Sequence, residues 1–359
     1  GTMKIEKADE RAVIQILRGI AIVLVVIHHV MKCFSLSNEL NTLLTIINTV
    51  HVVVFFVISG WLFEKKKCKY RKNGIFLFLK KKFCQLIVPY TTFSFSFAIL
   101  IWLGSHIEVL KQATLALAKG RVKSLVQIIV DIVLYRNVYY ESLWFVYAMF
   151  FLMALMFLLY DDRFVRLPFV ISMLLLATFI KSYAWMLIDL ERWTILNNTI
   201  MYFPWMLFGR LLYTRLHNGF VVKWNIVAIA ALVLSMCIIR WYYIDLKCFM
   251  GLYARAIWQG LEFLAIRLSF LALVLALSKW LIITDKYKPI EYIGDMSYDI
   301  YLIHNPWIVS TLSIILKNRV TIPLAIVIGT IMTIVISVTV INVIKCYLNP
   351  IYKVYFGKI

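Results

Sequence analysis

The sequence predicts an all-α, polytopic membrane protein of about ten transmembrane helices with both termini in the cytoplasm. Apolar residues make up 63% of the 359 residues, and the mean hydropathy is +0.86. Soluble globular domains have an apolar share nearer one half. Apolar runs of about 18 or more residues recur along the whole chain, as membrane-spanning helices require. We therefore expect one integral membrane domain that covers residues 1–359.

Basic residues give the orientation. Ten spans place both ends of the chain on one side, and Lys4, Lys7 and Arg11 precede the first span while segment 64–82 holds nine lysines and arginines. Positive residues gather on the cytoplasmic side, which makes both segments cytoplasmic. The candidate spans are 12–34, 43–63, 84–104, 142–160, 167–187, 197–215, 224–243, 260–283, 296–316 and 322–346.

The longest stretch outside these spans is 105–141, which this topology places on the outer side. Within it, Val122 to Tyr135 is apolar but carries a lysine, a glutamine and an aspartate. It is too short and too polar to cross a bilayer comfortably. We expect an interfacial or re-entrant helix there.

Composition also excludes several classes of protein. The net charge is +20, but the basic residues lie between apolar runs instead of on one soluble face, so nucleic-acid binding is not expected. The six cysteines are scattered without C-x-x-C spacing. They predict neither a disulfide framework nor a zinc site, and we expect no metal. The first apolar segment is too long and too polar for a cleavable signal, so we expect it to stay in the protein.

The first span carries ionisable side chains where hydrocarbon is expected. The run Leu17 to His29 reads LRGIAIVLVVIHH, and charged groups inside a span usually serve a function or have partners. Arg18 and His29 are nearly three helical turns apart, so both lie on one face with a rise of about 16 Å between them. His28 is a quarter-turn away. This spacing predicts a polar path across part of the bilayer, bordered by Arg18 and His29.

The second span reads HVVVFFVISGWLF from His51 onward. Ser59 and Gly60 are small residues that permit close helix packing, so Ser59 is either part of a packing notch or a substrate contact. His51 lies near the outer end of this span. Alone it is more typical of an interfacial histidine than of a catalytic one.

The ninth span presents three polar groups at helical spacing. Ser297, Tyr301 and His304 follow an i, i+4, i+7 pattern, so one face shows a hydroxyl, a phenol and an imidazole in order of depth. Pro306 then frees a backbone carbonyl. A single histidine in a membrane helix is often only a structural group. Two helices that each offer one at comparable depth favour a shared site of His29 and His304.

Further candidates lie outside these three spans. The basic segment 64–82 either marks topology or attracts a polyanionic ligand such as a nucleotide-bearing cofactor, and the two interpretations are compatible. Trp144 is typical of a membrane-interface residue, and Glu141 close to it is a conceivable partner for a histidine or an arginine. We interpret Glu262 and Arg267 in the eighth span as a structural pair or as groups that reach the interface, outside the site.

Together these motifs resemble the acyltransferase-3 family of multipass O-acyltransferases, which modify cell-envelope and other sugars. The resemblance runs from the first span to the ninth, and the H-x-x-x-F-F form of the second motif is closer to the branch of fucose 4-O-acetylase-like proteins. Many relatives carry two arginines before the proline of the third span, where this chain has Lys82 and Gln85. The matching segments are RGIAIVLVVIHH, HVVVFFVISGWLF, ESLWFVYAMFF and GDMSYDIYLIHNPW.

The resemblance implies a donor that is usually cytoplasmic acetyl-CoA and a sugar or glycan acceptor on or near the outer face of a bacterial cytoplasmic membrane. His29 and Arg18 then correspond to the essential histidine and arginine of the family. Moving an acetyl group to a hydroxyl needs a base that works near neutral pH, which suits His29. Alternatively, His29 is itself acylated and relays the group outward.

The remaining candidates divide between the two substrates. Tyr301, His304 or Ser59 would donate to the developing oxyanion. Arg18 would hold a phosphate or the pantetheine carbonyls of the donor. The full sets are Arg18, Lys65, Lys81 and Lys82 for the donor, and Ser59, His51, Trp144 and Glu141 for the acceptor.

Two other classes of protein compete with the enzyme. Buried arginines and histidines are equally natural in a transporter or flippase for a glycan or lipid-linked substrate, although the internal symmetry typical of transporters is absent from the sequence. A membrane anchor or sensor, whose polar residues only hold helices together, is the second. The sequence predicts neither the identity of the acceptor nor the oligomeric state.

Overall fold

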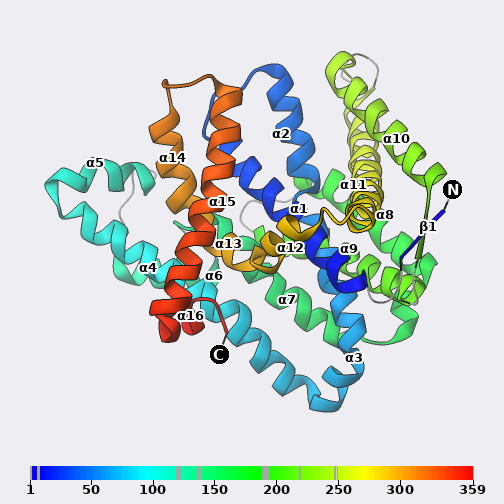
Figure 1. Cartoon of the computed structure of the whole chain (residues 1–359), viewed down its shortest axis with the longest axis horizontal. Coiled ribbons are helices and arrows are strands. Elements are labelled where there is room, and N and C mark those ends of the chain that lie inside the picture. The colour runs from blue at the N-terminus through cyan, green and yellow to red at the C-terminus, as the bar shows by residue number, and fades with distance from the viewer. Residues whose placement is uncertain are drawn as a thin grey trace. The chain divides into compact units, whose positions relative to one another are not determined.

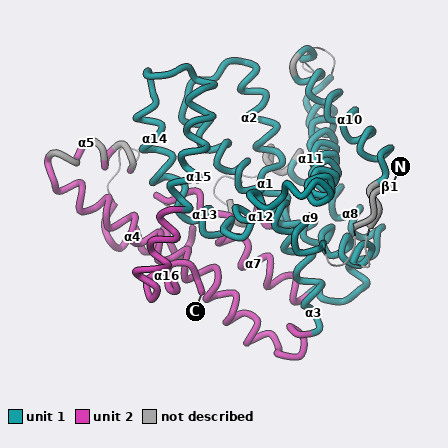
Figure 2. Tube along the Cα trace, viewed as in Figure 1, with its two compact units in different colours: residues 1–68, 159–190, 200–338 teal, residues 69–158, 191–199, 339–359 magenta. Residues whose placement is uncertain are grey.

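The structure is a computed structural model that is almost entirely helical (Figure 1). The chain divides into two compact units (Figure 2). The first holds residues 1–68, 159–190 and 200–338, and the second holds 69–158, 191–199 and 339–359. The expected single domain over the whole length stays a prediction. The structure describes residues 2–5, 9–118, 123–135, 139–187, 194–217, 220–245, 248 and 250–358.

The first unit contains most of the helices. It also holds two short strands, β1 (Thr2–Ile5) and β2 (Phe220–Lys223), which pair antiparallel with Thr2 opposite Lys223. The helices are α1 (Glu10–Met31), α2 (Asn38–Val50), the first part of α3 (Val53–Lys82), α8 (Leu167–Leu187), most of α9 (Thr194–Leu216), α10 (Trp224–Tyr243), α11 (Leu252–Ile283), α12 (Lys288–Asp295), α13 (Ser297–Ile303), α14 (Val309–Leu316) and most of α15 (Ile322–Tyr347).

The second unit is built on α4. The phenol of Tyr90 in α4 donates a hydrogen bond of 2.6 Å to the carbonyl of Ile132 in α6, and Ser96 lies 2.7 Å from the hydroxyl of Tyr355 in α16. These bonds hold two short helices against one long one. Its helices are the second part of α3, α4 (Val88–Ser105), α5 (Glu108–Leu117), α6 (Leu125–Leu134), α7 (Trp144–Leu158) and α16 (Asn349–Tyr355), with the start of α9 and the end of α15.

Helix covers each of the ten predicted spans. By length and composition, seven helical stretches in the described part of the chain suffice to cross a membrane. This confirms an all-α, integral membrane protein, while the count of ten and the side of the termini stay predictions. The seven stretches are Glu10–Met31, Asn38–Ser105, Glu141–Leu158, Trp224–Trp241, Leu252–Ile283, Ser297–Leu316 and Ile322–Tyr347.

The predicted span 43–63 lies within the apolar helical stretch Asn38–Ser105, but a short turn interrupts its helix. Helix α2 ends at Val50 and α3 begins at Val53. The imidazole Nδ1 of His51 lies 3.0 Å from the carbonyl oxygen of Ile47 and 3.1 Å from that of Asn48. The side chain therefore satisfies carbonyls that a continuing helix would use, and this contact accompanies the break.

The stretch 105–141 contains the expected helix. Helix α6 covers most of the predicted segment Val122–Tyr135, and Lys123 forms an ion pair of 2.6 Å with Asp131. Its helical character is confirmed, whereas an interfacial or re-entrant location stays a prediction. Residues 119–122 and 136–138 lie outside the described part of the chain.

Glycines bring the helices of the first unit into close contact. A Cβ on Gly294 in α12 would lie 1.9 Å from the carbonyl oxygen of Gln15 in α1, and one on Gly19 would lie 2.2 Å from that of Ile290. Such distances leave no room for any side chain. Helices α1 and α12 therefore cross backbone to backbone, which fixes the start of α13 beside α1.

Candidate functional site

Four imidazoles meet in the first unit, and we call His28, His29, His51 and His304 the imidazole cluster. The ring centroids of His29 and His304 are 5.1 Å apart, and those of His28 and His29 are 5.0 Å apart. The ring of His28 stacks on that of His51 at 4.5 Å. The cluster thus joins α1, the break after α2 and the segment that follows α13.

Backbone contacts indicate the tautomer of two of these rings. Nδ1 of His304 lies 2.8 Å from the carbonyl oxygen of Tyr301 and 3.2 Å from that of Ile300. Nδ1 of His51 likewise faces two carbonyls. Because a carbonyl can only accept, Nδ1 of each neutral ring carries the proton. Nε2 of His51 and of His304 is then left as an acceptor.

Exposure separates one imidazole from the other three. His28, His51 and His304 are 8%, 7% and 0% exposed, whereas His29 is half-buried. Nδ1 of His28 and Nε2 of His304 are buried without a hydrogen-bond partner among the described residues. His29 is therefore the least buried member of the cluster. One turn further along, Sγ of the exposed Cys33 lies 3.4 Å from the backbone oxygen of His29.

The ninth predicted span supplies His304 through an interrupted helix. Helix α13 ends at Ile303, and Asn305 has an extended backbone with φ −135° and ψ 133° before α14 begins. The predicted polar residues of this segment are all buried, with Ser297 at 4% and Tyr301 at 5% exposure. The ring centroid of Tyr301 lies 5.7 Å from that of His304. The phenol and the imidazole are thus neighbours, as expected.

Arg18 lies on the same helix as the cluster but apart from it. The helical rise puts it about 16 Å from His29. Its guanidinium lies 3.4 Å from the side-chain oxygen of Gln15. The carboxylate of Asp295, at the end of α12, attracts this guanidinium electrostatically. The structure therefore places the guanidinium beside the crossing of α1 and α12, and the imidazoles three turns away.

The predicted donor lysines belong to two units. In the first unit, Nζ of Lys65 lies 2.9 Å from a carboxylate oxygen of Glu10. In the second, Lys81 is exposed, and Nζ of Lys82 lies 3.4 Å from the side-chain oxygen of Gln85. The structure thus joins Lys82 and Gln85 within the second unit.

The predicted acceptor residues are also divided between the units. His51 belongs to the imidazole cluster, while Ser59 is half-buried on α3. A Cβ on Gly60 would lie 1.9 Å from the carbonyl oxygen of Met206 in α9, so the neighbour of Ser59 forms a helix-packing notch. In the second unit, Glu141 is exposed and Trp144 is half-buried at the start of α7.

The interpretation of Glu262 and Arg267 as a pair is wrong. Glu262 binds Arg240 of α10, with 2.6 Å between Oε1 and Nε. Nε of Arg267 instead donates a 3.0 Å hydrogen bond to the carbonyl of Thr49 in the last turn of α2. The two side chains point to different partners because they are more than one helical turn apart and α11 packs against both α10 and α2.

Sequence reasoning missed two residues of this site. His28 was set aside because it is a quarter-turn from His29, yet its ring contacts both His29 and His51. Arg267 is 6% exposed, and its guanidinium carbon lies 5.7 Å from the ring of Trp205. The signal for Arg267 was present, since a charge inside a span is by itself a candidate functional group.

The described residues include no group of three or more histidines, cysteines or acids that could hold a metal ion, the imidazole cluster included. The arrangement suits proton transfer, because it combines the half-buried imidazole of His29 with two rings whose Nε2 atoms are able to accept a hydrogen bond.

Comparison with known proteins gives the family. A family model described as an acyltransferase domain matches residues 11–342, nearly the whole chain. No curated protein and no solved structure matches the sequence, and the fucose 4-O-acetylase-like branch stays a prediction. The match includes every residue of the imidazole cluster and of the crossing of α1 and α12. The chain therefore belongs to the acyltransferase-3 family and is an integral membrane acyltransferase.

Proposed function

We propose that this acyltransferase moves an acetyl group from cytoplasmic acetyl-CoA to a hydroxyl of a cell-envelope sugar or glycan at a bacterial cytoplasmic membrane. The observation that carries the proposal is the half-buried His29, in ring contact with the fully buried His304. An imidazole is the side chain best suited to take a proton from a hydroxyl near neutral pH. The family match supports the acyl transfer itself and does not favour the transporter alternative.

In this proposal His29 acts as the general base and His304 as its positioning residue. The acceptor hydroxyl gives its proton to a ring nitrogen of His29 while its oxygen attacks the thioester carbonyl. The other ring nitrogen of His29 then donates toward Nε2 of His304, which is left as an acceptor by the Nδ1 contact with the Tyr301 carbonyl. Such an acceptor stabilises the charge that develops on His29.

The tautomer of His304 decides which side chain donates a hydrogen bond to the oxyanion of the tetrahedral intermediate. A neutral His304 with its proton on Nδ1 has no hydrogen to offer from Nε2, so the donor role falls to Tyr301 or Ser59. Collapse of the tetrahedral intermediate then breaks the carbon–sulfur bond. The proton held by His29 passes to the departing thiolate of coenzyme A, which balances the reaction. In the alternative course, His29 attacks the thioester and carries the acetyl group to the sugar.

Cationic side chains would hold the donor. Arg18 carries a planar guanidinium that suits a phosphate or the pantetheine carbonyls, and Lys65, Lys81 and Lys82 provide further positive charge. Lys65 already pairs with Glu10, so its contribution requires that this exposed pair opens. No metal takes part in the proposed reaction.

The test is turnover of labelled acetyl-CoA by the purified protein in lipid nanodiscs. We expect the chain to release free coenzyme A and to transfer label to envelope glycan, and we expect His29→Gln to lower both by about 10²- to 10⁴-fold, as removal of a general base does. His217→Gln is the matched control, because the hydrogen bond and the ring contact of His217 are both to Tyr213 of its own helix. Equal turnover in the two variants would contradict the proposal.

A further inference from the structure

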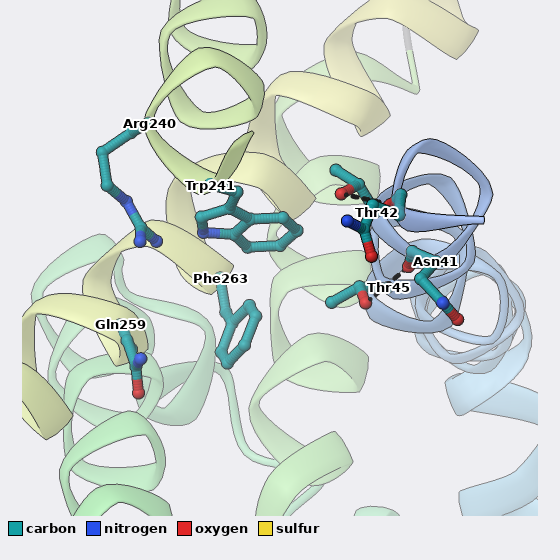
Figure 3. Close-up of a pocket in the computed structure, with 8 residues that line it drawn as sticks. Asn41, Thr42, Thr45, Arg240, Trp241, Gln259 and Phe263 are labelled. Atoms are coloured by element: carbon teal, nitrogen blue, oxygen red, sulfur yellow. Dashed lines mark hydrogen bonds between the residues drawn. The ribbon is translucent and has the colours of Figure 1, made fainter. Parts of the chain in front are cut away.

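A second polar pocket lies in the first unit, between the start of α2, the end of α10 and the start of α11 (Figure 3). Its volume is about 700 Å³, within the range of pockets for small ligands. In the view of Figure 3, the rings of Trp241 and Phe263 lie between Arg240 and Gln259 on one side and the α2 residues on the other. None of these residues belongs to the imidazole cluster.

The pocket carries little net charge. Among its described lining residues, Arg240 is the one that is charged. Its guanidinium makes two hydrogen bonds to the carboxylate of Glu262, one of them 2.6 Å long. Glu262 also accepts from the indoles of Trp241 and Trp258, at 3.1 and 2.9 Å. Because the positive charge is neutralised, a phosphate or carboxylate finds no free cation here, and an uncharged ligand is favoured.

Helix α2 presents a row of hydrogen-bond acceptors to the pocket. The hydroxyl of Thr42 donates to the carbonyl of Asn38 at 3.0 Å, and that of Thr45 donates to the carbonyl of Asn41 at 2.9 Å. The side-chain amide of Asn41 donates to the Leu36 carbonyl at 3.1 Å. The hydroxyl oxygens of Thr42 and Thr45 are then left to accept, while Asn41 keeps its amide oxygen as an acceptor and a second amide hydrogen as a donor. The complementary ligand is rich in hydroxyl donors.

Two aromatic rings form the apolar part of the pocket. The ring centroids of Trp241 and Phe263 are 5.6 Å apart in an edge-to-face arrangement. The indole N–H of Trp241 is bound to Glu262, and the guanidinium carbon of Arg240 lies 5.9 Å from the ring centroid, so the half-buried ring is fixed in the pocket wall. A pyranose ring has a face of C–H groups that packs on such a surface while its hydroxyls point outward.

Helix α2 links the pocket to the imidazole cluster. Helix α2 runs from the pocket to His51, and the six residues from Thr45 to His51 correspond to a rise of about 9 Å. The ring of His51 stacks on that of His28. A chain of two or three sugar rings is long enough to span such a distance.

We propose that this pocket binds an uncharged sugar unit of the acceptor glycan, stacked on Trp241 and hydrogen-bonded to the α2 oxygens and to Gln259. The inference rests on the proposed function, because it makes the pocket the acceptor subsite of that reaction. It adds the prediction that the bound sugar is neutral.

The test is sugar binding without any acyl donor, measured by saturation-transfer NMR on the full chain in nanodiscs. The neutral probes are maltotriose, triacetylchitotriose and 2′-fucosyllactose, and the charged probe is trigalacturonic acid. We expect at least one neutral probe to bind more tightly than the charged one. Trp241→Ala should weaken that binding at least tenfold, and Thr45→Val, which removes one acceptor without changing shape, should weaken it about two- to tenfold.

Trp224→Ala is the matched control, because Trp224 lies at the other end of α10 and is 47% exposed. It should bind sugar as the unmodified protein does. Thermal unfolding of each variant identifies one that fails to fold, and Thr45→Val keeps the test valid if Trp241→Ala does. The proposal is overturned if no neutral probe binds, if trigalacturonic acid binds best, or if folded Trp241→Ala and Thr45→Val both bind normally.

The two proposals fail in different ways. Labelled acetyl transfer without sugar binding at the pocket overturns the acceptor subsite alone. Binding that depends on Trp241 and Thr45 in a protein that never consumes acetyl-CoA overturns the proposed function, and with it the acceptor role of the pocket.

Discussion

His304 lies with its ring centroid 5.1 Å from that of His29, although the two imidazoles come from opposite ends of the first unit's sequence. The contact is possible because α12 crosses α1 at two glycines and α13 then leads the chain back along α1. The half-buried ring of His29 thus lies against the buried ring of His304, and two backbone carbonyls set the orientation of His304. The following predictions test this arrangement and the helix contacts that support it.

Replacing His304 with phenylalanine should slow acyl transfer by about ten- to a hundredfold, the value of a hydrogen bond to a charged group. The ring volume is kept while the Nε2 acceptor is lost. The measurement is the transfer rate across pH values, and the rate of the variant should depend on pH differently from that of the unmodified protein because the partner of His29 is gone. An unchanged pH profile would show that His304 only fills space.

Gly294→Ala should destabilise the protein by about 1 to 3 kcal/mol, the usual cost of overpacking. The new Cβ would lie 1.9 Å from the carbonyl oxygen of Gln15, so α1 and α12 must separate. Thermal unfolding in detergent measures the change. The control is Gly251→Ala, because a Cβ at Gly251 meets nothing within 4 Å. Equal melting temperatures for both variants would contradict the close crossing.

Arg210→Met should cost about 3 to 5 kcal/mol, because it removes the buried partner of the Glu64 carboxylate and leaves only the more exposed Lys67 to pair with it. Arg210 is fully buried, its Nε lies 2.7 Å from Glu64, and another nitrogen donates to the carbonyl of Tyr160 at 2.8 Å. Adding Glu64→Gln should recover part of the loss, since the buried negative charge is then removed. Chemical denaturation measures both variants.

A matched control for Arg210 is Arg163→Met. Arg163 forms an exposed pair of 3.0 Å with Asp161 and thereby lowers the pKa of that carboxyl. Exposed pairs contribute little to stability. A larger loss at Arg163 than at Arg210 would mean that the Glu64 pair is not a structural support of α3 and α9.

Arg267→Lys should lower stability by about 1 to 3 kcal/mol while keeping the charge. The lysine cannot reproduce both the Nε hydrogen bond to the Thr49 carbonyl and the contact of the guanidinium with the ring of Trp205. The last turn of α2 then loosens, and His51 with it. Thermal unfolding and the acyl-transfer rate are the measurements. The control is Arg255→Lys, in the first turn of α11, which should change neither the melting temperature nor the transfer rate.

Hydropathy and spacing predicted much of this molecule. Apolar runs located the helices because a bilayer demands long apolar segments whatever the fold. The intramembrane polar residues Arg18, His29 and His304 stood out for the same reason, since charge in hydrocarbon is costly. The i, i+4, i+7 spacing correctly grouped Tyr301 with His304. These features depend on the local sequence alone.

Features set by tertiary packing escaped the sequence. The break between α2 and α3 coincides with contacts of the His51 side chain to carbonyls of its own helix, which hydropathy does not detect. His28 entered the cluster because the end of α2 packs against α1 on that side. Glu262 and Arg267 found different partners because α10 and α2 both lie beside α11. None of these neighbours can be read from spacing along one helix.

The thiol of Cys33 is a site for chemical labelling next to the imidazole cluster. It is exposed, and it sits one turn beyond His29 with its sulfur at the His29 backbone oxygen. A maleimide too polar to enter lipid would label it only from the side of the bilayer on which α1 ends. Because Cys68, Cys248 and Cys346 are also free and exposed, a variant that keeps Cys33 as its one cysteine is needed. Sulfhydryl labelling of intact vesicles that hold this variant reads out the orientation of α1.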